Sequence, residues 1–146
     1  MTGAPARTTL YTPDLLALAV SLAEVPLDPE LPLRGDARSA TCGGSVMLGC
    51  AVDSDRRVAR VGLRASACAV GQAAAALFAL SATGRDLAEI ERSRIAIGHW
   101  LSGGPLPDWP GLDALAPALG YPARHGAITL AWDAARAALS KDDGHR

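Results

Sequence analysis

Two cysteines and one histidine stand where predicted elements begin, and their side chains are ligands for zinc, iron and iron–sulfur centres. Cys42 lies in segment 41–44, Thr-Cys-Gly-Gly, directly before a predicted strand, and the two glycines leave the thiol uncovered at a loop tip. Cys68 precedes a predicted helix, where the positive end of the helix dipole favours the thiolate, the metal-binding and nucleophilic form. His125 begins the last predicted helix beside a glycine. These three residues are the candidate metal site.

The residue types alone leave two other interpretations open. Cys42 and Cys68 could be small buried hydrophobic residues, and His125 a capping or surface histidine. A hydrolase or cysteine enzyme could instead use Cys42 or Cys68 with His125. The sequence has no nucleophile elbow, zinc-protease motif or phosphate-binding loop that favours an enzyme.

The elements around these residues predict an α+β fold with a small antiparallel sheet and helices packed on one face. Alternating apolar residues over 45–52 and 57–65 predict a hairpin, with Cys50 on its buried face beside Val46 and Leu48. On the second strand the alternation places Ala59, Val61, Leu63 and Ala65 on that face. Helical spacing and cap signals predict the remaining elements: an edge strand over 34–40, and helices beginning at Pro13 after Thr12, at Ala69, after the capping box Asp86–Glu89, over 112–119 and from His125 to Leu139.

Length and composition indicate one folded domain over residues 1–146, with 1–10 and 140–146 as frayed tails. The chain is 49% hydrophobic and 20% charged, and its net charge of −1 gives no sign of a nucleic-acid or acidic membrane surface. No apolar segment has the form of a secretory signal or of a membrane span. Three cysteines do not form a disulfide framework, so we expect a reducing cytoplasm.

The order of three short segments resembles the IscU/NifU/SufU family of iron–sulfur cluster assembly scaffolds. The resemblance runs from the first helix to Leu139, and residues 103–120 lengthen the region where SufU-type proteins carry an insertion. The three segments are Thr41-Cys42-Gly43-Gly44, Ala67-Cys68-Ala69 and Arg124-His125-Gly126. The resemblance also includes Gly84-Arg85-Asp86-Leu87, before the helix between the second and third segments.

The resemblance implies a fold like the NifU N-terminal domain and a partial site of Cys42, Cys68 and His125 for iron, zinc or a labile iron–sulfur cluster. Two usual ligands of the family are missing, because Gly44 stands at its aspartate position and Gly126 at its last cysteine. Asp36 or Asp108 could supply a fourth ligand.

Two functions follow from the resemblance. The first is a scaffold-like protein, not an enzyme, with a cysteine desulfurase and cluster acceptors as partners. The second is a degenerate homologue that binds no metal and acts as an interaction protein, with the Trp109 loop and the apolar rim of the site as its surfaces. Trp100 and Trp132 are predicted core residues because of their helical spacing.

Overall fold

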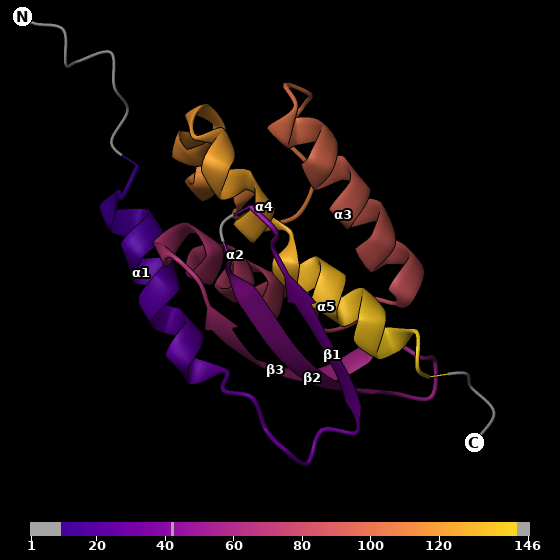
Figure 1. Cartoon of the computed structure of the whole chain (residues 1–146). Coiled ribbons are helices and arrows are strands. Elements are labelled where there is room, and N and C mark those ends of the chain that lie inside the picture. Colours follow the sequence, from indigo (N-terminus) through magenta and orange to yellow (C-terminus); the bar gives the residue numbers. More distant parts are fainter. Residues whose placement is uncertain (1–9, 42, 143–146) are drawn as a thin grey trace, which may run out of the picture.

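The computed structural model of the chain describes residues 10–41 and 43–142. Along the chain, one α-helix and a short 3-10 helix precede a three-stranded sheet, and the other helices come after it (Figure 1). Along the chain the elements are α1 (Pro13–Ser21), η2 (Leu22–Glu24), β1 (Leu33–Arg38), β2 (Ser45–Val52), β3 (Val58–Ser66), α2 (Ala69–Ser81), α3 (Leu87–Leu101), η3 (Leu112–Gly120), η4 (Pro122–Arg124), α4 (His125–Ile128) and α5 (Leu130–Leu139), where η denotes a 3-10 helix.

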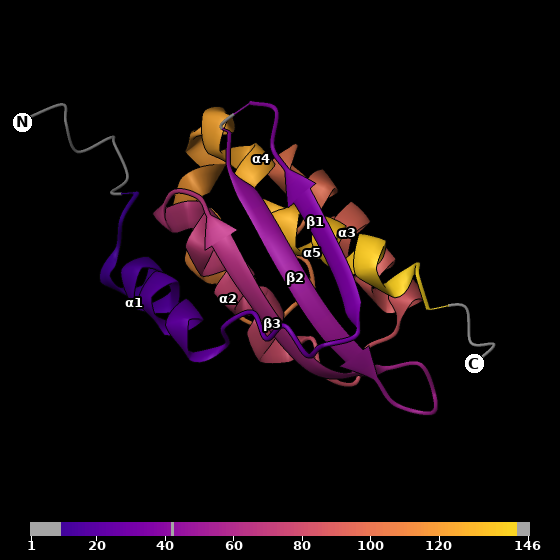
Figure 2. The same cartoon turned by 60° about the horizontal axis from the view of Figure 1, so that its bottom comes forward.

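The sheet is an antiparallel meander in the order β1-β2-β3. Val46 of β2 lies opposite Ala37 of β1 and Ala65 of β3. The predicted edge strand and hairpin are therefore confirmed, as is the α+β fold class. β1 and β3 are the two edges, and the turn from β1 to β2 lies at the same end of the sheet as the end of β3 (Figure 2).

The predicted core face of β3 is wrong at one residue. Cys50 pairs with Val61 and Ala51 with Arg60, but Val52 pairs with Val58. Ala59 is therefore the extra residue of a β-bulge, which reverses the alternation of side chains beyond it. Ala59 is exposed, and Val58 takes the core position with 2% exposure.

Helices cover one face of the sheet (Figures 1 and 2). Helix α5 packs so closely on β1 that a Cβ on Gly35 would overlap the carbonyl oxygen of Ala134. Helix α3 lies outside α5 and is joined to it by the ion pair between Arg94 Nε and Asp133 Oδ1, at 2.8 Å. The predicted arrangement of helices on one face is confirmed.

The connection from α1 to β1 crosses part of the opposite face (Figure 2). The Leu63 N–H donates to the Val25 carbonyl at 2.9 Å, and a Cβ on Gly49 would lie 3.1 Å from Leu31 Cβ. Leu31 is only 3% exposed, so this proline-rich linker is packed against the sheet. The face beyond this crossing, toward the β1–β2 turn, carries exposed side chains such as Met47.

Helices α1 and α3 begin where the capping signals in the sequence predict. Thr12 Oγ1 accepts from the Leu15 N–H at 3.1 Å, and Asp86 and Glu89 form the predicted reciprocal capping box. The predicted last helix is divided, because α4 ends before Thr129 and α5 begins after it. The predicted helix over 112–119 is a 3-10 helix, η3.

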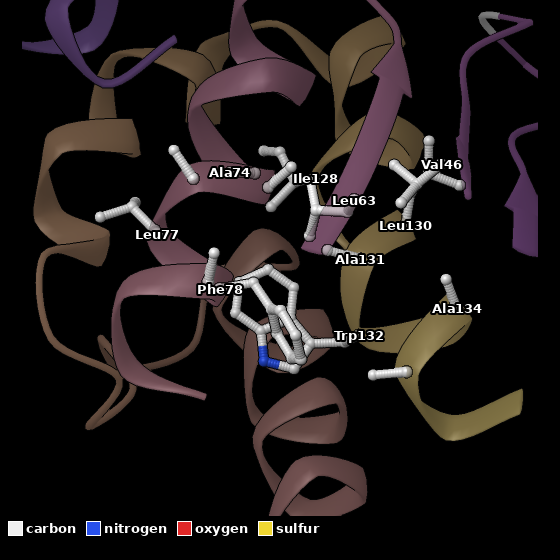
Figure 3. Close-up of a cluster of buried hydrophobic side chains, with 14 of the residues drawn as sticks. Val46, Leu63, Ala74, Leu77, Phe78, Ile128, Leu130, Ala131, Trp132 and Ala134 are labelled. Atoms are coloured by element: carbon white, nitrogen blue, oxygen red, sulfur yellow. The ribbon is translucent and has the colours of Figure 1, made fainter. Parts of the chain in front are cut away.

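Three aromatic rings form the centre of the core. Phe78 stacks on Trp109 with ring centroids 5.4 Å apart, and Trp132 meets both rings edge-on (Figure 3 shows Phe78 and Trp132). Trp132 is fully buried and Trp100 is 5% exposed, as predicted. The prediction that the Trp109 loop offers a docking surface is wrong for the ring itself, which is 3% exposed and donates from Nε1 to the Leu77 carbonyl at 2.9 Å.

Candidate functional site

The first predicted ligand segment is the turn between β1 and β2. The Ser39 N–H donates to the Gly44 carbonyl at 2.8 Å, and the Gly43 N–H donates to the Ser39 carbonyl at 3.1 Å. Gly43 has a φ of 72°, a left-handed conformation that favours glycine. Cys42 itself lies outside the described residues. Its neighbours Thr41 and Gly43 are exposed, and their turn is anchored at Ser39, which is 7% exposed.

Cys68 occupies the N-cap position of α2, two residues after the end of β3. Its backbone is extended, and its carbonyl accepts from the Gln72 N–H at 2.9 Å, so the helix begins directly after it. The side chain makes no capping hydrogen bond to the helix and is partly exposed. The thiol therefore lies at the N-terminal end of α2, partly open to solvent and not engaged in capping the helix.

The imidazole of His125 has a fixed orientation. Nε2 lies 3.1 Å from the Ala118 carbonyl oxygen and 3.2 Å from that of Leu119. Carbonyl oxygens only accept, so Nε2 is the donor in both contacts and Nδ1 is the ring nitrogen left for a further partner. Histidine ligands of metals are commonly held in this way, with one nitrogen donating to a backbone carbonyl while the other binds the ion.

The elements that carry the three ligand segments pack together beside His125. A Cβ on Gly126 would lie 2.5 Å from Ser39 Oγ and 2.7 Å from Thr41 Oγ1, so the β1–β2 turn touches α4. A Cβ on Gly71 would lie 3.1 Å from Ala127 Cβ, so the first turn of α2 also touches α4. The turn, α4 and the start of α2 also lie at one end of the sheet in Figures 1 and 2.

Ser39 and Thr41 are parts of this arrangement that sequence reasoning missed. Their hydroxyls are 3.1 Å apart and occupy the space that a side chain at residue 126 would need. The available signal was Gly126, since a glycine next to a candidate ligand often marks a close approach of another segment.

No group of three or more histidine, cysteine or acidic residues that could hold a metal occurs within residues 10–41 and 43–142. Cys42 is not among them, so the set of Cys42, Cys68 and His125 stays a prediction. Asp36 is exposed in the middle of β1, opposite Met47. Asp108 lines a cleft with Arg85, beyond the C-terminal end of α2. The 13 residues of α2 span about 20 Å at 1.5 Å per residue, so Asp108 is remote from Cys68.

Cys50 is the predicted core cysteine and is 1% exposed. Burial raises the pKa of its thiol from 9.0 to about 11, with a smaller contribution from the negative charge of Asp142. The neutral thiol of Cys50 therefore stabilises the fold fully below pH 9, and this contribution is lost as the pH rises toward 11.

We expect Cys50 to resist a thiol-specific chromogenic reagent at pH 8 in the native protein and to react once urea unfolds the chain. The physical reason is that the reagent requires an accessible thiolate, and Cys50 is buried and protonated. Stopped-flow absorbance with Cys50→Ala as the matched control checks this. Native Cys50 reacting as fast as Cys68 would contradict it.

Comparison with known proteins identifies the fold. No protein-family model and no curated protein matches the sequence. Solved structures do match: the N-terminal part of a nitrogen-fixing NifU-like protein from Brucella abortus has a TM-score of 0.83 and 24% identity, over 94% of this chain and 96% of that one. The chain has the NifU-like fold.

A second solved structure with the same fold is a SufU protein. The protein from Fervidobacterium islandicum AW-1, described as an iron–sulfur cluster assembly scaffold for the SUF system, has a TM-score of 0.77 and 16% identity, over 89% of this chain and 96% of that one. The predicted family resemblance is thereby confirmed at the level of the fold. Within the part of the chain that the structure describes, no helix has the length and apolar character needed to cross a bilayer.

Proposed function

We propose that this chain is an iron–sulfur cluster assembly scaffold-like protein that binds iron, zinc or a labile cluster through Cys42, Cys68 and His125. The observation that carries the proposal is the contact of α4 with both the β1–β2 turn and the start of α2. The fixed proton on His125 Nε2 adds support, because it leaves Nδ1 available as a ligand.

The chemistry of the donors fits this cargo. Two thiolates and an imidazole suit zinc and iron, and one coordination position stays open for a persulfide, a water molecule or a ligand from a partner. Such a site holds an ion less firmly than a closed four-ligand site, and a [2Fe–2S] cluster usually takes four ligands. We therefore propose weak, transferable binding, sulfur supply by a cysteine desulfurase, transfer to acceptor proteins and no enzymatic turnover by this chain itself. Thiolate ligands need reduced cysteines, so we place the protein in the cytoplasm.

The test is zinc binding by protein purified without a metal-affinity tag, stripped of metal and titrated anaerobically against a chromophoric chelator. We expect Cys42→Ser, Cys68→Ser and His125→Ala each to weaken binding by at least about tenfold, because even outer partners of a metal ligand contribute that much. Cys50→Ala is the matched control, with unchanged affinity. Wild-type affinity in the Cys68→Ser variant would refute the site.

A metal-free interaction protein is the second candidate. It is favoured by the Ser39 and Thr41 hydroxyls, which fill the space of a side chain at Gly126, where the scaffold family has a cysteine. Elemental analysis separates the two candidates. Stoichiometric zinc or iron in protein purified without a tag supports the scaffold, and a folded, metal-free protein that also fails the zinc titration supports the interaction protein.

A further inference from the structure

The outer face of the sheet carries an exposed apolar side chain at the same end as the candidate site. Met47 of β2 is 43% exposed, and its neighbours across the strands are Asp36 of β1 and Arg64 of β3, both exposed. These three residues pair in one row of the sheet, on the face opposite the helices. That face is turned toward the viewer in Figure 2. The α1–β1 linker covers the next row on this face, that of Gly49 and Gly62, which lies farther from the β1–β2 turn.

Arginines surround Met47 on this face. Arg34 and Arg38 lie on β1, each two residues from Asp36 and on the same face of the sheet. Among the residues that the structure describes, neither they nor Arg64 form an ion pair, whereas Arg60 on the same face pairs with Asp28 at 3.0 Å. We call Arg34, Asp36, Arg38, Met47 and Arg64 the basic face. It carries three positive charges and one negative charge on a chain whose net charge is −1.

The basic face adjoins the candidate site. Arg38 pairs with Ser45 at the base of the turn in which Cys42 falls, and Ser45 also pairs with Ser66, two residues before Cys68. A macromolecule docked on Met47 and its arginines would therefore border the segments that carry the candidate ligands. A stable protein interface buries about 800 Å² on each partner, so a partner bound at the candidate site would also extend over neighbouring surface.

A hollow of about 240 Å³ beside Met47 could receive a side chain of such a partner. Arg34, Asp36 and Lys141 are among its lining residues, and Lys141 Nζ donates to the Arg34 carbonyl at 2.6 Å. Methionine and arginine are enriched in protein interfaces, where an apolar centre is surrounded by polar groups. A nucleic acid would gain nothing from Met47 and would be repelled by Asp36.

We propose that the basic face docks an acidic surface of the protein that delivers sulfur to the candidate site. This inference rests on the proposed function and specifies the partner: a cysteine desulfurase with a patch of acidic residues beside its own active-site opening. The unpaired arginines attract that patch over several ångströms and accelerate encounter, and Met47 packs into the interface once the two proteins are in contact.

The test measures association of the full chain with the cysteine desulfurase of the same organism by stopped-flow fluorescence at low and high salt. The variant is Arg38→Glu with Arg64→Glu. The matched control is Arg92→Glu with Arg136→Glu, two exposed arginines on the helices, which changes the net charge equally. We expect the association rate constant at low salt to fall at least about tenfold in the variant only, with loss of its salt dependence. Circular dichroism verifies that both variants are folded.

Three outcomes would overturn the proposal: equal association rates for both variants, no binding of the wild-type chain to the desulfurase, or binding to duplex DNA or phosphatidylglycerol vesicles that only the Arg38/Arg64 variant loses. Failure of the proposed function is visible separately in the zinc titration of the wild-type chain. If the chain binds the desulfurase through the basic face but binds no zinc, the docking proposal holds and the proposed metal site is refuted.

Discussion

Replacing Trp109 by alanine should lower the free energy of unfolding by about 3–5 kcal/mol, a large part of the 5–15 kcal/mol that holds a typical domain folded. The ring stacks on Phe78, meets Trp132 edge-on and donates to the Leu77 carbonyl. The Arg85 guanidinium covers it, with Cζ 4.1 Å from the ring centroid. Removal would leave a cavity between α2 and the loop that precedes η3. Urea unfolding followed by circular dichroism measures the change.

Leu106→Ala is the matched control, because Leu106 lies in the same loop and is 52% exposed. It should change the unfolding free energy by no more than about 0.5 kcal/mol. A Trp109→Ala variant as stable as wild type would mean that the ring does not hold the loop. Trp109 would then again be a candidate for a docking surface.

The second large effect concerns residue 126. Gly126→Cys alone should gain no zinc affinity and should cost about 1–3 kcal/mol of stability, because its Cβ meets the Ser39 and Thr41 hydroxyls. Adding Ser39→Ala and Thr41→Ala opens the space. The triple variant should bind zinc at least about 100-fold more tightly, since even outer partners of a ligand contribute 10–100-fold. Gly44→Asp is omitted, because Gly44 is buried and a carboxylate there would be desolvated.

Chelator competition measures the affinity, and visible absorption after anaerobic reconstitution reports whether a cluster is retained. Gly126→Ser in the same double-alanine background is the control. It repeats the repacking without supplying a thiolate. Equal zinc affinity in the cysteine and serine variants would show that residue 126 does not face the metal.

The sequence predicted the elements because their signals are local. Strand alternation located Ser45–Val52, and the hydrogen-bonding side chains of Thr12 and Asp86 marked two helix starts. The bulge at Ala59 was missed, because it depends on the register with β2 and not on the residues of β3. Trp109 was misjudged because a proline-rich loop predicts exposure, and only the tertiary fold brings this ring onto Phe78.

The candidate site was predictable only in its order along the chain. Nothing local to Ser39 indicates that its hydroxyl abuts Gly126, since 87 residues separate them and the contact requires the β1–β2 turn to reach α4. The hydrogen bonds of His125 to Ala118 and Leu119 depend on how η3 ends, which the glycine and proline signals did not specify. Sequence patterns identify ligand types, whereas their orientation is set by contacts between distant segments.

The hydrogen bonds from His125 Nε2 to Ala118 and Leu119 connect the end of η3 to the metal site that we propose. An ion bound to Nδ1, as we propose, would make the Nε2–H a stronger donor and would strengthen its hydrogen bonds to the Ala118 and Leu119 carbonyls. By reciprocity, a protein that holds η3 in this position raises metal affinity by the same factor, and one that pulls η3 away lowers it. In the scaffold that we propose, a partner protein that binds η3 would therefore alter metal affinity without contact to the ion.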